Sequence, residues 1–351
     1  MNNQTSSLPV RATKRTLRYT NRIVDGIFVV LMLFLLLVAI YIKMDSDSVY
    51  QAADPRRWIQ YKPELPDDVE TFEDLQKKNE DIIGWLTLYG TTIDYPLLYA
   101  QEDNNYYLNH NALKEPESSG SIFLDYRNQR DFSDFNNILH GHHMAEHKMF
   151  GDLDLFAGEE FFRDHEFGNL FFNGDDHGVQ ILAVILTDGY DSNIYKTGIR
   201  TDEEKVRFIN YVYERAKLIR GVDLTNKSQE ERARTLLQQG VTSPITPRDT
   251  ILTLSTCNLT ETNGRYIVIA KLLDHTVPNP YEETDLKKEN NERIDTFTLF
   301  NRYGSLPLYV WFGILLLLIL LTYILYKLSR RRDRKLWKNR KEENGAYDQN
   351  E

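Results

Sequence analysis

Residues 250–271 read TILTLSTCNLTETNGRYIVIAK, two runs of β-forming residues separated by a short polar loop. The first run ends on Cys257, the single cysteine in 351 residues, and the second begins at Gly264 and Arg265. Neighbouring strands joined by such a loop bring their loop ends together, so we expect Cys257 and Arg265 to lie side by side. A guanidinium there can favour the thiolate, or donate to an oxyanion once a carbonyl is attacked.

A cluster of histidines follows the apolar pair Ile138-Leu139, where residues 139–144 read LHGHHM. A nucleophilic cysteine needs an imidazole that is near in space rather than in sequence, and this cluster can supply one. His140, His142, His143 and His147 also allow a metal site. They lack a matching carboxylate or cysteine set at a known ligand spacing, although Glu146 is close. We expect acid–base chemistry here, with no metal and no cofactor.

Short β-like runs recur through the middle of the chain between turn residues and predict a closed or nearly closed β-barrel. The chain is therefore expected to be mainly β, with peripheral helices. The predicted strands cover residues 82–86, 92–98, 121–124, 169–173, 179–186, 250–254 and 266–273. The predicted helices are a short one at 71–79 with Phe72 and Leu75 inward, one after the Thr201–Glu204 capping box with Val206, Ile209, Tyr213 and Ala216 on one face, and a polar cover at 229–239.

Two long apolar runs lie near the ends of the chain. Residues 27–42 follow five basic residues, and residues 306–328 precede the basic segment SRRRDRKLWKNRK. Because basic flanks stay in the cytoplasm, both termini are expected inside and the intervening chain outside. A cleaved signal peptide is the alternative for the first run, although Ala52-Ala53 is a poor cleavage site. The net charge of −10 argues against non-specific binding of nucleic acid. The basic tail is better explained as a cytoplasmic flank of the membrane span that also contacts anionic lipid.

Several motifs together resemble the sortases, and class B sortases in particular. Residues 141–144 (GHHM), 149–153 (MFGDL) and 253–257 (TLSTC), with Arg265, carry the resemblance in the second half. Residues 83–86 (IGWL), 93–96 (IDYP), 106–110 (YYLNH) and 120–127 (GSIFLDYR) carry it in the first half, in the same order, over about residues 69–273. The resemblance implies an eight-stranded sortase barrel with His142, Cys257 and Arg265 as the catalytic residues. Ser121 and Thr256 are candidates for substrate binding, with a structural hydroxyl as the alternative for each.

The resemblance also implies the reaction and the partners. Cys257 would cleave a C-terminal sorting signal after threonine, and an amine from a cell-wall precursor or a pilin lysine would resolve the thioester. The substrates would be surface proteins or pilins. A hydrolytic cysteine peptidase and a non-enzymatic, membrane-anchored binding ectodomain remain as alternatives.

Some features depart from class B sortases. The second apolar run is typical of pilus-building sortases of class C. The aspartate-proline-aromatic lid of that class is not clearly present, because Arg56 follows Asp54-Pro55. His140 stands where the family often has tyrosine. The expected organisation is a basic cytoplasmic segment (1–26), a transmembrane anchor (27–43), a stalk (44–66), the catalytic domain (67–280), a linker (281–305), a second transmembrane helix (306–328) and a cytoplasmic basic tail (329–351).

Overall fold

A computed structural model describes residues 8–63, 71–99, 102–220, 245–257, 263–281, 313–321, 323–324 and 327. The chain divides into two units, one formed by Met1–Ser48 with Asp295–Glu351 and the other by Val49–Ile294. The helix predicted at 229–239 lies outside the described residues.

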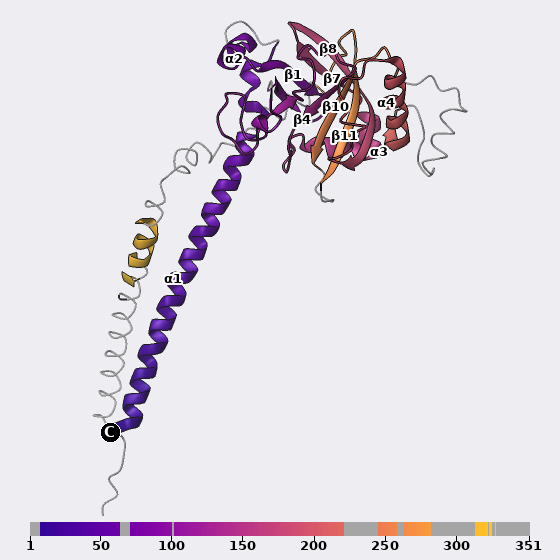
Figure 1. Cartoon of the computed structure of the whole chain (residues 1–351). Helices are drawn as coiled ribbons and strands as arrows, with labels where there is room; N and C mark the ends of the chain where they lie inside the picture. Colours follow the sequence, from indigo (N-terminus) through magenta and orange to yellow (C-terminus); the bar gives the residue numbers. More distant parts are fainter. Residues whose placement is uncertain are drawn as a thin grey trace, which may run out of the picture. The chain divides into compact units, whose positions relative to one another are not determined.

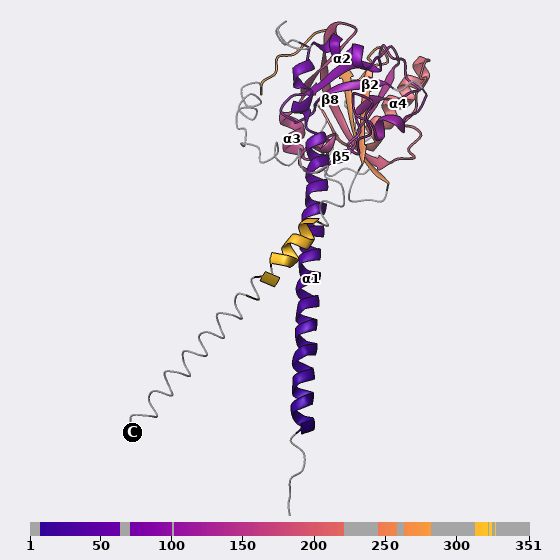
Figure 2. The ribbon, with the colours of Figure 1, turned by 90° about the vertical axis from the view of Figure 1, so that its left-hand side faces the viewer.

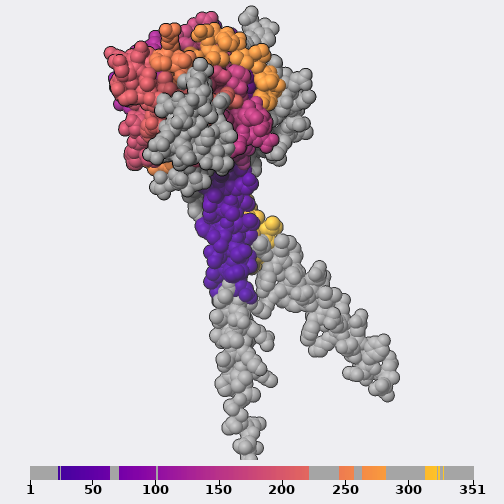
Figure 3. Space-filling model, turned by 90° about the vertical axis from the view of Figure 1, so that its right-hand side faces the viewer, coloured from indigo at the N-terminus to yellow at the C-terminus, as the bar shows by residue number. Residues whose placement is uncertain are grey.

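The first unit contains most of helix α1 (Leu8–Ala52). From Asp25 to Ala52 this helix, drawn in indigo and purple in Figure 3, is long and apolar enough to cross a membrane, and most of its large apolar side chains up to Ile42 are exposed. It can therefore serve as a membrane anchor, as the first apolar run predicted. Of the second predicted span, residues 313–321, 323–324 and 327 are helical, and the remainder of 306–328 lies outside the described residues.

The second unit is built on a sheet that closes on itself (Figures 1 and 2). Its eight strands follow the order β11-β10-β4-β3-β2-β1-β7-β8, and β8 pairs again with β11. The β2–β3 and β4–β10 pairs are parallel, so the barrel is mixed. The barrel strands are β1 (Ile82–Leu88), β2 (Asp94–Tyr99), β3 (Ile122–Leu124), β4 (Asn136–His140), β7 (Phe167–Phe172), β8 (Asp175–Asp188), β10 (Ile251–Cys257) and β11 (Gly264–Leu272). This confirms the predicted eight-stranded barrel.

Three further strands lie outside the closed barrel. β9 (Ala216–Ile219) pairs with β8, and β5 (His143–Met144) pairs with β6 (Lys148–Met149) in a small hairpin. None of the three was predicted, because each is too short to show a period of two.

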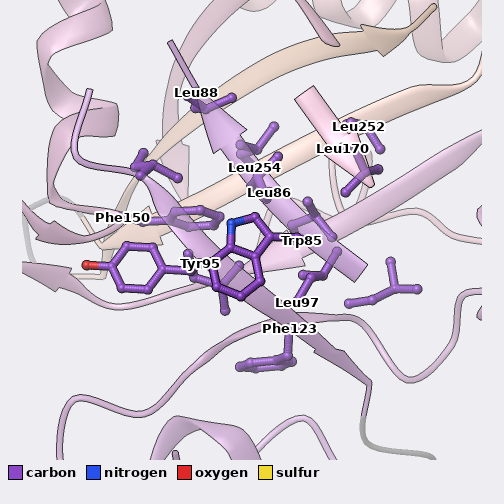
Figure 4. Close-up of a cluster of buried hydrophobic side chains, with 14 of the residues drawn as sticks. Trp85, Leu86, Leu88, Tyr95, Leu97, Phe123, Phe150, Leu170, Leu252 and Leu254 are labelled. Carbon is purple, nitrogen blue, oxygen red and sulfur yellow. The ribbon is translucent and has the colours of Figure 1, made fainter. Parts of the chain in front are cut away.

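Large apolar side chains form one cluster that fills the barrel and continues beyond it, here called the inner cluster. Trp85, Tyr95, Phe123 and Phe150 are almost fully buried in this cluster, together with leucines of neighbouring strands (Figure 4). The indole Nε1 of Trp85 donates to Oδ1 of Asp94 at 2.6 Å, so the polar atom of this core residue is satisfied.

A second apolar cluster covers the outer face of the barrel. Ile251 of β10 and Ile267 of β11 belong to it, whereas their neighbours Leu252 and Val268 belong to the inner cluster. This alternation follows from the period of two in a strand. Position 257, like 251 and 255, therefore falls on the outer face of the barrel.

Helix α4 (Asp202–Arg215) packs onto this outer cluster, and its capping box at Thr201 and Glu204 is confirmed. The predicted apolar face was partly wrong, because Val206 is 44% exposed. The buried stripe consists of Phe208, Ile209, Val212 and Tyr213. Helical spacing fits more than one stripe, and the larger ring of Phe208 replaces Val206 against the barrel.

The segment before the predicted catalytic domain differs from a stalk. Ala53, Trp58 and Tyr61 are buried in the inner cluster, and the hydroxyl of Tyr95 donates to the carbonyl of Ala53 at 2.8 Å. The folded unit thus begins before residue 67, because aromatic residues scattered in a polar stretch still find a core. Helix α2 (Phe72–Lys78) is confirmed, with Phe72 and Leu75 buried, and α3 (Glu159–Asp164) was not predicted.

Candidate active site

Two of the predicted residues are neighbours on adjacent strands. β10 ends on Cys257, and its antiparallel pairing with β11 places Cys257 directly opposite Arg265. Directly paired residues share one face of a sheet. The backbone register therefore confirms the expected proximity of these two positions.

The third predicted residue, His142, lies two residues beyond the end of β4, which pairs with β10 on the side opposite β11. Ser255 pairs with His140 in the parallel ladder, and the amide of Gly141 donates to the carbonyl of Ser255 at 3.3 Å. His142 follows this last pair by two residues, as Cys257 does on β10. The strand that ends on Cys257 therefore lies between β11, which carries Arg265, and β4, which leads to His142.

The chain beyond β4 passes close to the barrel core at Gly141, where only glycine fits. A Cβ on this residue would lie 2.7 Å from Cδ2 of the buried Phe150 ring. The amide of Phe150 also donates to the carbonyl of His142 at 2.9 Å. The backbone around His142 is therefore held against the barrel core.

The imidazole of His142 is oriented by a backbone carbonyl. Its Nε2 lies 2.9 Å from the oxygen of Leu108, in the 3₁₀ turn Tyr106–Leu108. Because a carbonyl only accepts, Nε2 is the donor in this contact, and Nδ1 is the acceptor nitrogen of the neutral ring. Sequence reasoning missed this partner, since a backbone atom leaves no residue signal.

The guanidinium of Arg265 lies against the loop that follows β8. Its Nη1 donates to the carbonyl of Gly264 at 2.9 Å, and Thr187 of β8 is its partner in the sheet. A Cβ on Gly189 would come within 3.1 Å of Nη2. A glycine at position 189 therefore leaves room for the guanidinium on the β8 side of β11.

A polar cavity of about 310 Å³ adjoins these strand ends. Arg265 lines one side, and the loop after β8 lines another through Tyr190, Asp191 and Tyr195. Asp125, Arg127 and His140, which follow or end strands β3 and β4, line the remainder with Asn104. The cavity therefore lies beside Arg265 on the outer face of the barrel.

One wall of this cavity is a connected polar network. His140 Nε2 lies 3.0 Å from Oδ2 of the fully buried Asp125, and the Tyr195 ring stacks on His140 at a centroid distance of 6.1 Å. The Tyr195 hydroxyl in turn lies 2.7 Å from the hydroxyl oxygen of Ser255. Burial acts to raise the pKa of Asp125, but hydrogen bonds from Arg127 and His140 outweigh it and hold the pKa well below its usual range.

Of the candidate residues, His142, Ser121 and Thr256 do not line this cavity. The hydroxyl of Ser121 donates to the carbonyl of His110 at 2.9 Å, which is the structural alternative for that residue. Thr256 is 2% exposed and, by strand alternation, falls on the opposite face from position 257.

The histidines of the cluster pair with separate carboxylates. His140 pairs with Asp125, His143 with Asp154 and His147 with Asp152. Within the described ranges, no group of three or more potential ligands gathers at one point.

Comparison with known proteins gives concordant matches. No protein-family model matches the chain. Sortase B of Listeria monocytogenes is 33% identical over 206 residues, covering 58% of this chain and 74% of that protein. Sortase B of Staphylococcus aureus is 31% identical over 207 residues, with the same coverage of 58% and 74%. Among solved structures, Clostridium perfringens sortase B is 29% identical with a TM-score of 0.50, covering 58% of this chain and 100% of that one.

Proposed function

The chain belongs to the sortase family of cysteine transpeptidases, with sortase B proteins as its relatives, and we propose that Cys257, His142 and Arg265 catalyse its reaction. The pairing of β10 with β11, which carries Arg265, and with β4, which leads to His142, supports this assignment. The family relationship favours a transpeptidase over a hydrolytic peptidase or a binding ectodomain.

The first half of the reaction forms a thioester. The thiolate of Cys257 attacks the carbonyl carbon of the scissile bond in the sorting signal, and the oxygen becomes an oxyanion. Arg265 donates to that oxyanion from the adjacent strand. The carbon–nitrogen bond then breaks, and His142 transfers its proton to the leaving amine.

The second half transfers the acyl chain. An incoming amine attacks the thioester carbonyl and gives its proton to His142, and the carbon–sulfur bond breaks to regenerate the thiolate. The acceptor is an amine of a cell-wall precursor or a pilin lysine. We infer that the second apolar run, 306–328, gives the two-anchor arrangement of a pilus-building enzyme, with both termini cytoplasmic and the catalytic unit outside.

The reaction is testable with the full chain in detergent, a fluorescent sorting peptide and a set of small amines. We expect an amide product that depends on the added amine and disappears in Cys257→Ala, because no other thiol is available. Retention of the product in Cys257→Ala would refute the assignment. Comparison of a lysine-containing pilin peptide with a wall-precursor stem peptide identifies the acceptor.

A further inference from the structure

His143 is a buried histidine that follows the proposed acid–base residue. Its side chain is 7% exposed, and its Nε2 lies 2.9 Å from Oδ2 of Asp154. Because a carboxylate of this kind accepts, Nε2 is the protonated nitrogen of the pair. Its Nδ1 is buried and has no hydrogen-bond partner among the described residues. The side chain is therefore held in one orientation by a single strong contact.

The same imidazole contacts the strand that carries Arg265. Its ring stacks on that of Tyr266, with centroids 6.4 Å apart and planes 28° apart. Tyr266 is the residue after Arg265 in β11. His143 thus connects two parts of the proposed site. It follows His142 directly in the chain, and its ring packs on Tyr266, which follows Arg265 in β11.

The partner carboxylate is 37% exposed, but it belongs to a segment that packs closely against the chain around His143. Asp154 lies in the 3₁₀ helix Gly151–Ala157, where a Cβ on Gly151 would collide with the carbonyl oxygen of Met144. In β5, His143 pairs with Met149, whose amide donates to the Tyr95 hydroxyl in the barrel core at 3.0 Å. A displacement of His143 would therefore have to be taken up by the segment that contains His142.

We propose that His143 is a positioning residue for the transpeptidase. Its bond to Asp154 and its packing on Tyr266 keep the imidazole of His142 and the guanidinium of Arg265 at a constant spacing on either side of Cys257. This inference rests on the proposed function. Small misplacements of reacting groups, of about 1 Å, lower rates by up to about a hundredfold, while substrate binding is left intact.

The experiment compares three substitutions at position 143 in the full chain, with the peptide-transfer assay and the melting temperature measured for each. We expect His143→Ala to lower kcat by about tenfold or more with KM changed by less than about twofold. His143→Gln places an amide N–H near the position of Nε2 and should recover most of kcat, whereas the shorter His143→Asn should not. His165→Ala, a ring that packs on Phe161 and Tyr281 elsewhere in this unit, is the matched control and should leave kcat unchanged.

A double-mutant cycle with His143→Ala and Asp154→Ala tests the hydrogen bond between the two side chains. If both residues act through this bond, the double variant should lose no more kcat than the worse single variant. Fully additive losses, equal activity of the Gln and Asn variants, or wild-type kcat in His143→Ala would each overturn the inference. If His143→Ala does not fold, the comparison of Gln with Asn decides alone. Failure of the proposed function is seen separately, as turnover by Cys257→Ala.

Discussion

Replacing the buried carboxylate of the cavity wall, Asp125→Asn, should destabilise the catalytic unit strongly. Asp125 is fully buried and accepts hydrogen bonds from Arg127 at 2.7 and 2.8 Å. His140 Nε2 and Asn104 Nδ2 each lie 3.0 Å from Oδ2. An amide removes the charge and turns one oxygen into a donor that faces other donors.

The expected loss of stability follows from the ion pair between Asp125 and Arg127, which the substitution breaks. Removing one partner of a buried ion pair costs about 3–5 kcal/mol, because the other charge stays without compensation. The Arg127 side chain is 40% exposed and recovers part of its hydration. We therefore expect a loss of about 2–3 kcal/mol in the free energy of unfolding at pH 7.

The pH dependence has a definite sign. Burial favours the neutral acid, but the hydrogen bonds from Arg127 and His140 prevail, so the pKa of Asp125 in the folded state lies below its unfolded value. The stabilisation is present above the unfolded pKa of about 3.9 and is lost as the pH falls toward the folded pKa. The gap between wild type and Asp125→Asn should therefore narrow below about pH 4.

Urea unfolding of the full chain in detergent, followed by the fluorescence of the buried Trp58 and Trp85, measures this gap at pH 7, 5 and 3. Asp175→Asn, at an exposed position of β8, is the control and should change the free energy by less than about 0.5 kcal/mol. A loss below about 1 kcal/mol at pH 7 for Asp125→Asn, with no narrowing in acid, would refute the reasoning.

Three further results are expected. His142→Ala should lose about two to four decades of rate, whereas His140→Ala and His147→Ala should each lose much less, and a larger loss at either would show that the acid–base residue is misassigned. Arg265→Lys keeps the charge but not the planar fork of donors, so transfer should be severely impaired, and wild-type activity would contradict the oxyanion role. A C-terminal tag should resist protease added to intact cells, and its cleavage from outside would contradict the two-anchor topology.

The pairing of Cys257 with Arg265 followed from the sequence because it depends on local pattern. A run of β-formers that ends on Cys257 and a polar loop before Arg265 determine an antiparallel pair almost by themselves. The local pattern does not predict that the segment of His142 lies beside the strand of Cys257, because a parallel pairing of β4 with β10 has no local sequence signal. The family resemblance supplied that expectation.

The cavity wall did not follow from the sequence. Tyr195 reaches Ser255 across 60 residues, and the carbonyls of Ile194 and Lys196 accept from Asn136 at 3.1 and 3.0 Å. Such contacts depend on how a long loop folds back over the barrel, which neither periodicity nor composition encodes. The contribution of Asp125 to stability likewise depends on its burial, and the sequence carries no signal that a polar residue in a turn is buried.

Intact-mass spectrometry of the full chain with a sorting peptide tests the central claim most directly. With no amine acceptor added, we expect an adduct equal to the peptide minus its leaving fragment, mapped to Cys257 after digestion and released by hydroxylamine as a thioester. Cys257→Ala should show no adduct while keeping its melting temperature. An adduct on any other residue, or one that persists in Cys257→Ala, would contradict the account of this protein as a transpeptidase that acts through Cys257.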